Sequence, residues 1–141
     1  MSKITCTRRI EFDAAHRVMQ HSSKCKMLHG HRYVIEATFC SDQLDDLGMV
    51  IDFGIIKEIL GEWIDENWDH NTILNIKDQE LGDQIAKITD QKIYYLHCNP
   101  TAEEMASYLF EKICPKLFAN DKISCQKIKI FETPNCYASV K

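Results

Sequence analysis

The chain has 141 residues, 45% of them hydrophobic, which suits one domain with a buried core of ordinary size. Its formal net charge of −4 argues against general nucleic-acid binding, because such binding needs a basic surface. No uncharged run approaches the roughly 20 apolar residues of a membrane span, and residues 1–10 carry charges without the apolar stretch of an export signal. We therefore expect a single domain over residues 1–141, located in the cytoplasm, with neither a membrane nor a nucleic acid as partner.

Four segments show the alternation of half-buried strands. Residues 4–12 carry apolar side chains on one face and polar ones on the other, and residues 33–41 repeat this pattern. The two segments bracket a loop rich in histidine. Near the C-terminus, residues 123–131 alternate again and could pair with residues 136–140 across a short turn.

Two helices are predicted between these strand pairs. Residues 53–64 place apolar side chains at helical spacing, and Asp52 is a suitable N-cap. The second helix is signalled by a capping-box arrangement from Thr101 to Glu104, followed by apolar residues at helical spacing. Pro115 lies late in this pattern and should end or bend the helix.

A polar insert, residues 74–97, separates the two predicted helices. It has room for a short helix near residues 81–88 and a strand at residues 93–96. The element order reads ββααββ, which is typical of an α+β fold with an antiparallel sheet.

Three histidines around the first loop are candidate metal ligands. His29 and His31 lie two residues apart in an extended segment and therefore point the same way. His16 follows the first strand and supplies a third imidazole if the two strands form a hairpin. Three imidazoles without an obvious fourth ligand indicate an open catalytic site, with zinc as first choice although imidazole also suits iron, copper and nickel. Alternatively, His29 and His31 alternate on a polar strand face and His16 is a lone surface residue.

Cys25 lies four residues before His29 on the same loop, between Lys24 and Lys26. Nearby positive charge favours a thiolate, which would make Cys25 a base. As a fourth ligand it would instead close the metal site and make it structural. Most single cysteines are inert, and an odd total of seven with no repeated spacing indicates reduced thiols.

Two further sites hold candidate acid–base or binding groups. Asp69 and His70 offer an acid–base histidine with a carboxylate that fixes its tautomer. Glu132 ends an apolar strand, where a carboxylate could accept hydrogen bonds from a ligand. On spacing alone, the simpler interpretation of both is solvent exposure.

Five motifs resemble, in the same order, those of the family of 6-pyruvoyltetrahydropterin and 6-carboxytetrahydropterin synthases. The resemblance spans about residues 10–132. The motifs are Phe12-Asp13-Ala14-Ala15-His16-Arg17, Cys25-Lys26-Met27-Leu28-His29-Gly30-His31, Asp69-His70, Pro100-Thr101-Ala102-Glu103 and Glu132-Thr133.

The resemblance implies an architecture and a set of residue roles. The architecture is the tunnelling fold, or T-fold, in which ββααββ subunits join their sheets into a barrel and form homohexamers of two trimers, with sites between subunits. By resemblance, the three histidines bind catalytic zinc, Cys25 is the general base, and Asp69 and His70 complete the proton relay. Glu132 anchors the pterin ring of the small-molecule substrate, and Thr101 is a further substrate contact.

The spacing favours one branch of this family. Three residues separate Cys25 from His29, as in the bacterial carboxy-forming branch. That branch converts 7,8-dihydroneopterin triphosphate into 6-carboxytetrahydropterin, releasing acetaldehyde and triphosphate, on the route to queuosine. The nearest alternative is the pyruvoyl-forming synthase, and an alternative of another class is a non-catalytic, zinc-stabilised binding module. Two features depart from the family pattern: Glu104 stands where an asparagine is frequent, and the insert 74–97 is long. They concern the edge of the site, the contacts between subunits and the substrate preference.

Overall fold

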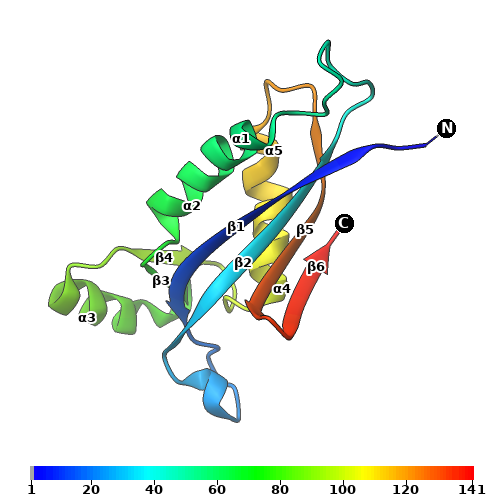
Figure 1. Cartoon of the computed structure of the whole chain (residues 1–141). Coiled ribbons are helices and arrows are strands. Elements are labelled where there is room, and N and C mark those ends of the chain that lie inside the picture. Colours follow the sequence, from blue (N-terminus) through cyan, green and yellow to red (C-terminus); the bar gives the residue numbers. More distant parts are fainter. Residues whose placement is uncertain (1) are drawn as a thin grey trace.

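A computed structural model describes residues 2–141. Figure 1 shows a curled sheet with the main helices packed against one of its faces. The strands are β1 (Thr5–His16), β2 (His29–Cys40), β3 (Thr72–Asn75), β4 (Ile93–Leu96), β5 (Ser124–Thr133) and β6 (Cys136–Val140). Their order in the sheet is β4-β3-β1-β2-β5-β6. Strands β1, β2, β5 and β6 are antiparallel, whereas β3 and β4 add in parallel beside the end of β1.

Strands β1 and β2 extend further toward their connecting loop than the apolar alternation predicted. Their register pairs His16 with His29 and Ala14 with His31. The backbone ladder continues where the apolar residues end, so the three histidines are strand residues rather than loop residues. At the other end, Ile4 was predicted to face inward, but it precedes β1 and is 54% exposed.

The two predicted helices begin at their predicted caps, and the structure has five α-helices among residues 2–141. They are α1 (Phe53–Ile56), α2 (Glu62–Asn67), α3 (Gln79–Thr89), α4 (Ala102–Tyr108) and α5 (Cys114–Leu117), with π-helical segments joining α1 to α2 and α4 to α5. The side chain of Asp52 accepts a hydrogen bond from the amide of Gly54 at 2.7 Å, which confirms the predicted N-cap. Pro115 lies in the first turn of α5, directly after a π-helical segment, and the helix ends two residues later at Leu117.

The insert contributes more to the sheet than was predicted. Helix α3 and strand β4 confirm the expected helix and strand, but β3 was missed. All four residues of β3 are buried, so this strand lacks the alternation that identifies a half-buried one. The sheet is consequently mixed rather than wholly antiparallel. No helix among residues 2–141 has the length and apolar character needed to cross a membrane.

The hydrophobic core lies between the sheet and the two long helical segments, α1–α2 and α4–α5 (Figure 1). Its largest fully buried side chains include Trp68, Tyr33 and Phe12. The rings of Phe12 and Tyr33 stack with centroids 5.1 Å apart. This packing holds β1 and β2 rigidly just before the strand ends that carry the histidines.

Candidate active site

The core-facing side of the sheet becomes polar at one end of three neighbouring strands. The side chains there are His16 on β1, His29 and His31 on β2, and Glu132 on β5. They occupy positions where the inward-facing apolar alternation of each strand would continue. The strand ladder therefore brings together residues 116 positions apart, from His16 to Glu132.

The three imidazoles converge as predicted. One ring nitrogen from each lies within 4.8 Å of the others, and Nε2 of His16 is 3.1 Å from Nε2 of His29. Nδ1 of His16 donates to the carbonyl of Pro100 at 2.6 Å, and Nδ1 of His29 donates to the carbonyl of Met27 at 2.7 Å. Because carbonyls only accept, Nδ1 carries the hydrogen in each ring, and in a ring with one N–H the Nε2 atom carries a lone pair. Two lone pairs this close are stabilised by a cation between them.

The protonation of these rings also suits a metal ion. Burial lowers the pKa of His16 to about 4, although its hydrogen bond to Pro100 acts in the opposite direction. Burial likewise lowers the pKa of His31. Both rings are therefore neutral at neutral pH, which is the form that binds metals. Nε2 of His31 is buried without a hydrogen-bond partner among residues 2–141, and a metal ion would satisfy it. The donor set fits a metal held by three imidazoles.

Glu132 lies over the same cluster. One carboxylate oxygen is 3.9 Å from Nε2 of His16 and the other is 3.7 Å from Nε2 of His31. Glu132 also lines a groove of about 340 Å³ between the start of α4 and strand β6, together with Glu103. Its carboxylate thus lies both beside the imidazoles and on the groove.

Cys25 lies on a short turn of the loop between β1 and β2 and is exposed. It is not part of the group of three converging imidazole nitrogens. The loop is held by a hydrogen bond from the amide of Val18 to the carbonyl of Cys25, at 2.8 Å. The role of Cys25 as a base stays a prediction, and a closed four-ligand site gains no support from this arrangement.

Asp69 and His70 form a second cluster after α2. Nδ1 of His70 lies 2.9 Å from a carboxylate oxygen of Asp69, whose other oxygen accepts a 3.0 Å hydrogen bond from the amide of Asp13. Burial alone would raise the pKa of Asp69, but these hydrogen bonds bring it below its ordinary value. The hydrogen bond to Asp69 raises the pKa of the exposed His70 ring. The pair therefore has the acid–base geometry that was predicted.

Asp13 is also a member of this second cluster, although its place in the sequence did not predict that role. Asp13 lies three residues before His16 on β1, so the two side chains point to opposite faces of the sheet. The carbonyl of Asp13 accepts a hydrogen bond from the amide of His70 at 2.6 Å, and its carboxylate pairs with Arg32 at 2.9 Å. Both hydrogen bonds to the pair use the backbone of Asp13 and therefore fix the pair at the outer edge of β1. The Asp13 carboxylate lies on the face without the imidazoles, within 4.8 Å of polar atoms of Asp69 and His70.

Comparison with known proteins decides the family. Residues 5–141 match the family described as 6-pyruvoyl tetrahydropterin synthase. The chain belongs to this family. The predicted resemblance is thereby confirmed.

Two sequence relatives within the 6-pyruvoyl tetrahydropterin synthase family carry the name 6-carboxy-5,6,7,8-tetrahydropterin synthase. The protein of Rickettsia conorii is 53% identical over 137 residues, which cover 97% of this chain and 99% of the relative. The protein of Aquifex aeolicus is 31% identical, and the aligned residues cover 92% of this chain and 93% of the Aquifex protein.

Solved structures agree with the predicted α+β T-fold. The 6-pyruvoyl tetrahydropterin synthase of Caenorhabditis elegans superposes with a TM-score of 0.69 at 27% identity, covering 100% of this chain and 96% of that one. An uncharacterised protein from Wolinella succinogenes reaches a TM-score of 0.82, over 99% of this chain and 98% of that one, and at 21% identity it supports the fold alone. The fold class is therefore confirmed.

Thr101, the further substrate contact expected for this synthase family, has a structural partner. Its hydroxyl accepts a hydrogen bond from the amide of Glu104 at 3.1 Å and caps α4. The carboxylate of Glu104 accepts instead from the thiol of Cys98, so only half of the capping box forms. A direct contact between Thr101 and substrate stays a prediction.

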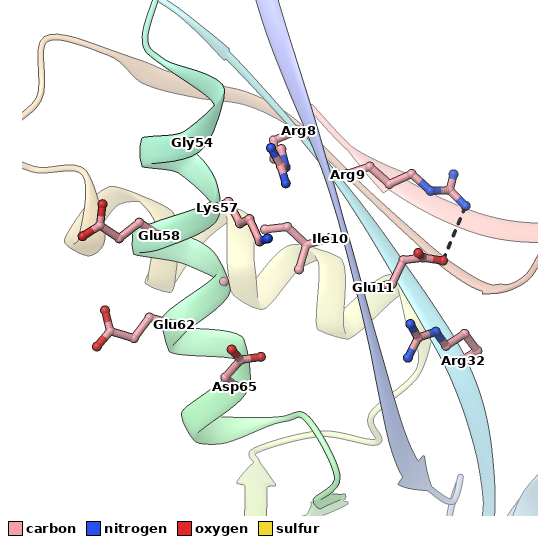
Figure 2. Close-up of a pocket in the computed structure, with 11 residues that line it drawn as sticks. Arg8, Arg9, Ile10, Glu11, Arg32, Gly54, Lys57, Glu58, Glu62 and Asp65 are labelled. Atoms are coloured by element: carbon pink, nitrogen blue, oxygen red, sulfur yellow. Dashed lines mark ion pairs between the residues drawn. The ribbon is translucent and has the colours of Figure 1, made fainter.

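A second groove of the synthase chain lies between β1 and the α1–α2 segment (Figure 2). Its charged lining is balanced, with four basic and four acidic side chains: Arg8, Arg9, Arg32, Lys57, Glu11, Glu58, Glu62 and Asp65. It contains none of the predicted site residues, and equal numbers of opposite charges give no preference for an anion. The imidazole cluster and its groove are therefore the candidate active site.

Proposed function

We propose that this protein is a 6-carboxy-5,6,7,8-tetrahydropterin synthase. The observation that carries the proposal is 53% identity over nearly its whole length to the Rickettsia conorii protein of that name. The proposed reaction converts 7,8-dihydroneopterin triphosphate into 6-carboxytetrahydropterin and releases acetaldehyde and triphosphate. The product would serve queuosine biosynthesis. Location in the cytoplasm and organisation as one domain stay predictions from the sequence.

The proposed metal is zinc, bound by His16, His29 and His31. The proposal is supported by two facing lone pairs 3.1 Å apart and by the orphaned, buried Nε2 of His31. When bound, zinc supplies a Lewis acid that stabilises negative charge on substrate oxygens. The protein's own contribution is to keep the His16 and His31 rings neutral by burial. The carbonyls of Pro100 and Met27 orient the His16 and His29 rings.

The remaining groups are proposed to bind substrate and move protons. The Glu132 carboxylate can pair with the amino-pyrimidine edge of the pterin through two hydrogen bonds, which orients the ring. The Cys25 thiolate would take the proton from the side-chain carbon next to the ring. His70, held by Asp69, would exchange a proton with the neighbouring hydroxyl. Each such proton transfer typically accelerates a reaction about 10²–10⁴-fold.

The two clusters are proposed to meet between subunits of a homohexamer. This is supported by two side chains of β1: Asp13 and His16 lie on opposite faces because they are an odd number of residues apart, and the Asp13 carboxylate lies within 4.8 Å of polar atoms of Asp69 and His70. It is also supported by the strand edges: among residues 2–141, the outer edge of β1 pairs only at Ala15 and His16. Unpaired strand edges favour pairing with another chain, as joining sheets into a barrel requires.

A product assay tests the proposal. Purified, zinc-loaded protein is given 7,8-dihydroneopterin triphosphate, and triphosphate, acetaldehyde and the pterin product are measured together. We expect acetaldehyde and triphosphate in equal amounts, with 6-carboxytetrahydropterin. Release of triphosphate without acetaldehyde would instead identify a pyruvoyl-forming synthase.

The product assay, combined with measurements of zinc content and folding, separates an enzyme from a zinc-stabilised binding module. In the Cys25→Ala variant, zinc content and folding should persist while turnover is lost, because the thiol lies outside the converging imidazoles. Loss of zinc or of folding would make Cys25 a structural ligand.

A further inference from the structure

The loop that carries Cys25 has little packing of its own to hold it. Residues 20–28 are exposed, so few buried apolar contacts restrain them. Inside the loop, the amide of Val18 donates to the carbonyl of Cys25 at 2.8 Å, and the amide of Met27 donates to the carbonyl of Lys24 at 2.9 Å. These bonds give the loop its shape, but its position on the protein depends on contacts at its base.

One side chain, from a segment distant in the sequence, supplies such a contact. The side-chain oxygen of Asn99 accepts from the amide of Met19 at 3.1 Å, and its NH₂ group donates to the carbonyl of Met19 at 3.2 Å. Asn99 therefore satisfies both backbone groups of one residue, as a neighbouring strand would. The buried Asn75 donates to the same oxygen at 3.2 Å, which fixes which end of the Asn99 amide is the oxygen.

The next residue in the chain holds a metal-ligand candidate. The carbonyl of Pro100 accepts from Nδ1 of His16 at 2.6 Å. Two consecutive residues, Asn99 and Pro100, thus bind the base of the Cys25 loop and the His16 ring. Between those two attachment points, Arg17 forms a two-pronged ion pair with the buried Asp78. The loop base is therefore fixed relative to the imidazoles by direct bonds.

We propose that Asn99 is a positioning residue that sets the place of Cys25 relative to the imidazole cluster. The proposal rests on the proposed function for the role of Cys25. Its chemistry requires a side chain with one acceptor and one donor at fixed separation. Aspartate keeps the acceptor for the Met19 amide but loses the donor, and alanine loses both.

The test compares Asn99→Ala with the wild-type protein by hydrogen exchange and kinetics. Amides of residues 18–27 should exchange about tenfold faster in the variant, because two backbone hydrogen bonds are lost. Exchange in β1 and β2 should not change. With 7,8-dihydroneopterin triphosphate, kcat should fall about 10–100-fold, as expected for a misplaced reacting group, while KM and zinc content stay within about twofold.

Two further variants make the comparison specific. Asn99→Asp should give intermediate exchange and an intermediate kcat, and it keeps the proposal testable if Asn99→Ala does not fold. Asp45→Ala is the matched control, because the Asp45 carboxylate also accepts two backbone hydrogen bonds, from Leu47 and Met49 at 2.9 Å each, in a different loop. It should leave exchange in residues 18–27 and kcat unchanged.

Unchanged exchange in residues 18–27 of both Asn99 variants would overturn the proposal. Faster exchange with an unchanged kcat would also overturn it, because turnover would then not depend on the position of the loop. If the wild-type protein forms no carboxypterin, the proposed function fails. In that event, hydrogen exchange alone decides whether Asn99 fixes the loop.

Discussion

Two of the three imidazoles of the candidate metal centre, those of His16 and His29, are oriented by the backbone rather than by another side chain. The carbonyls of Pro100 and Met27 hold Nδ1 of His16 and His29, so the Nε2 atoms must face the centre. Neither carbonyl could be identified from the sequence, because a backbone acceptor leaves no residue-type signal. The histidines themselves could be proposed as ligands, since two residues in an extended segment point the same way, but spacing alone left a polar strand face as the alternative.

The charges around Asp69 and His70 make the stability of the protein depend on pH. The hydrogen bond that the His70 ring donates to the Asp69 carboxylate raises the pKa of His70, with Asp13 adding to the effect and Arg32 opposing it. His70 therefore stays protonated to a higher pH than an ordinary histidine. Its stabilising contribution is fully present below the unfolded-state pKa, taken as 6.5, and is lost as pH rises through the raised folded value.

Replacing Asp69 with asparagine should lower the pKa of His70, because the charged partner is removed. The change is measured by following the ring proton resonances of His70 through an NMR titration of wild-type and Asp69→Asn proteins. The pH dependence of stability above 6.5 should flatten in the same variant. A His70 pKa that does not move would mean that the 2.9 Å contact does not persist in solution.

At the scale of elements, local signals predicted the helices well and the strands in part. Asp52 and Thr101 accept the amide hydrogen bonds expected of N-caps, because capping depends only on neighbouring residues. The ends of β1 and β2 were misplaced because polar histidines continue the ladder. Strand β3 was missed because pairing between distant segments, not its own pattern, makes it a strand.

Thr101 allows capping and substrate contact to be separated. Thr101→Ala should lower the free energy of unfolding by about 1 kcal/mol, because the Glu104 amide loses its acceptor. Thr101→Ser keeps a hydroxyl and should restore stability. Urea unfolding of the zinc-free proteins measures both. If Thr101→Ala matches wild-type stability but has a raised KM, the substrate contact outweighs the cap.

For the whole molecule, one chain holds all the proposed groups but attaches them to two faces. His16 and Glu132 belong to the core-facing side, whereas the Asp13 carboxylate lies on the other side, within 4.8 Å of polar atoms of Asp69 and His70. The order of the motifs along the chain could not reveal that the two clusters are separate. Their separation depends on the odd spacing of Asp13 and His16 within β1 and on the course of the chain after α2. We therefore predict that each cluster is completed by the other cluster of a second chain.

Mixing two inactive variants tests this arrangement. Cys25→Ala and His70→Ala chains should each lack activity, since each removes one half of every shared site. After co-expression in equal amounts, about a quarter of the interfaces combine an intact Cys25 with an intact His70 from the neighbouring chain, so about a quarter of wild-type turnover should return. Native mass spectrometry verifies that mixed oligomers form, and wild-type chains mixed with Cys25→Ala chains control for loss on assembly. Mixed oligomers without recovered turnover would mean that Cys25 and His70 act within one chain. The placement of Asp13 and His16 on opposite faces of β1 would then not indicate a shared site.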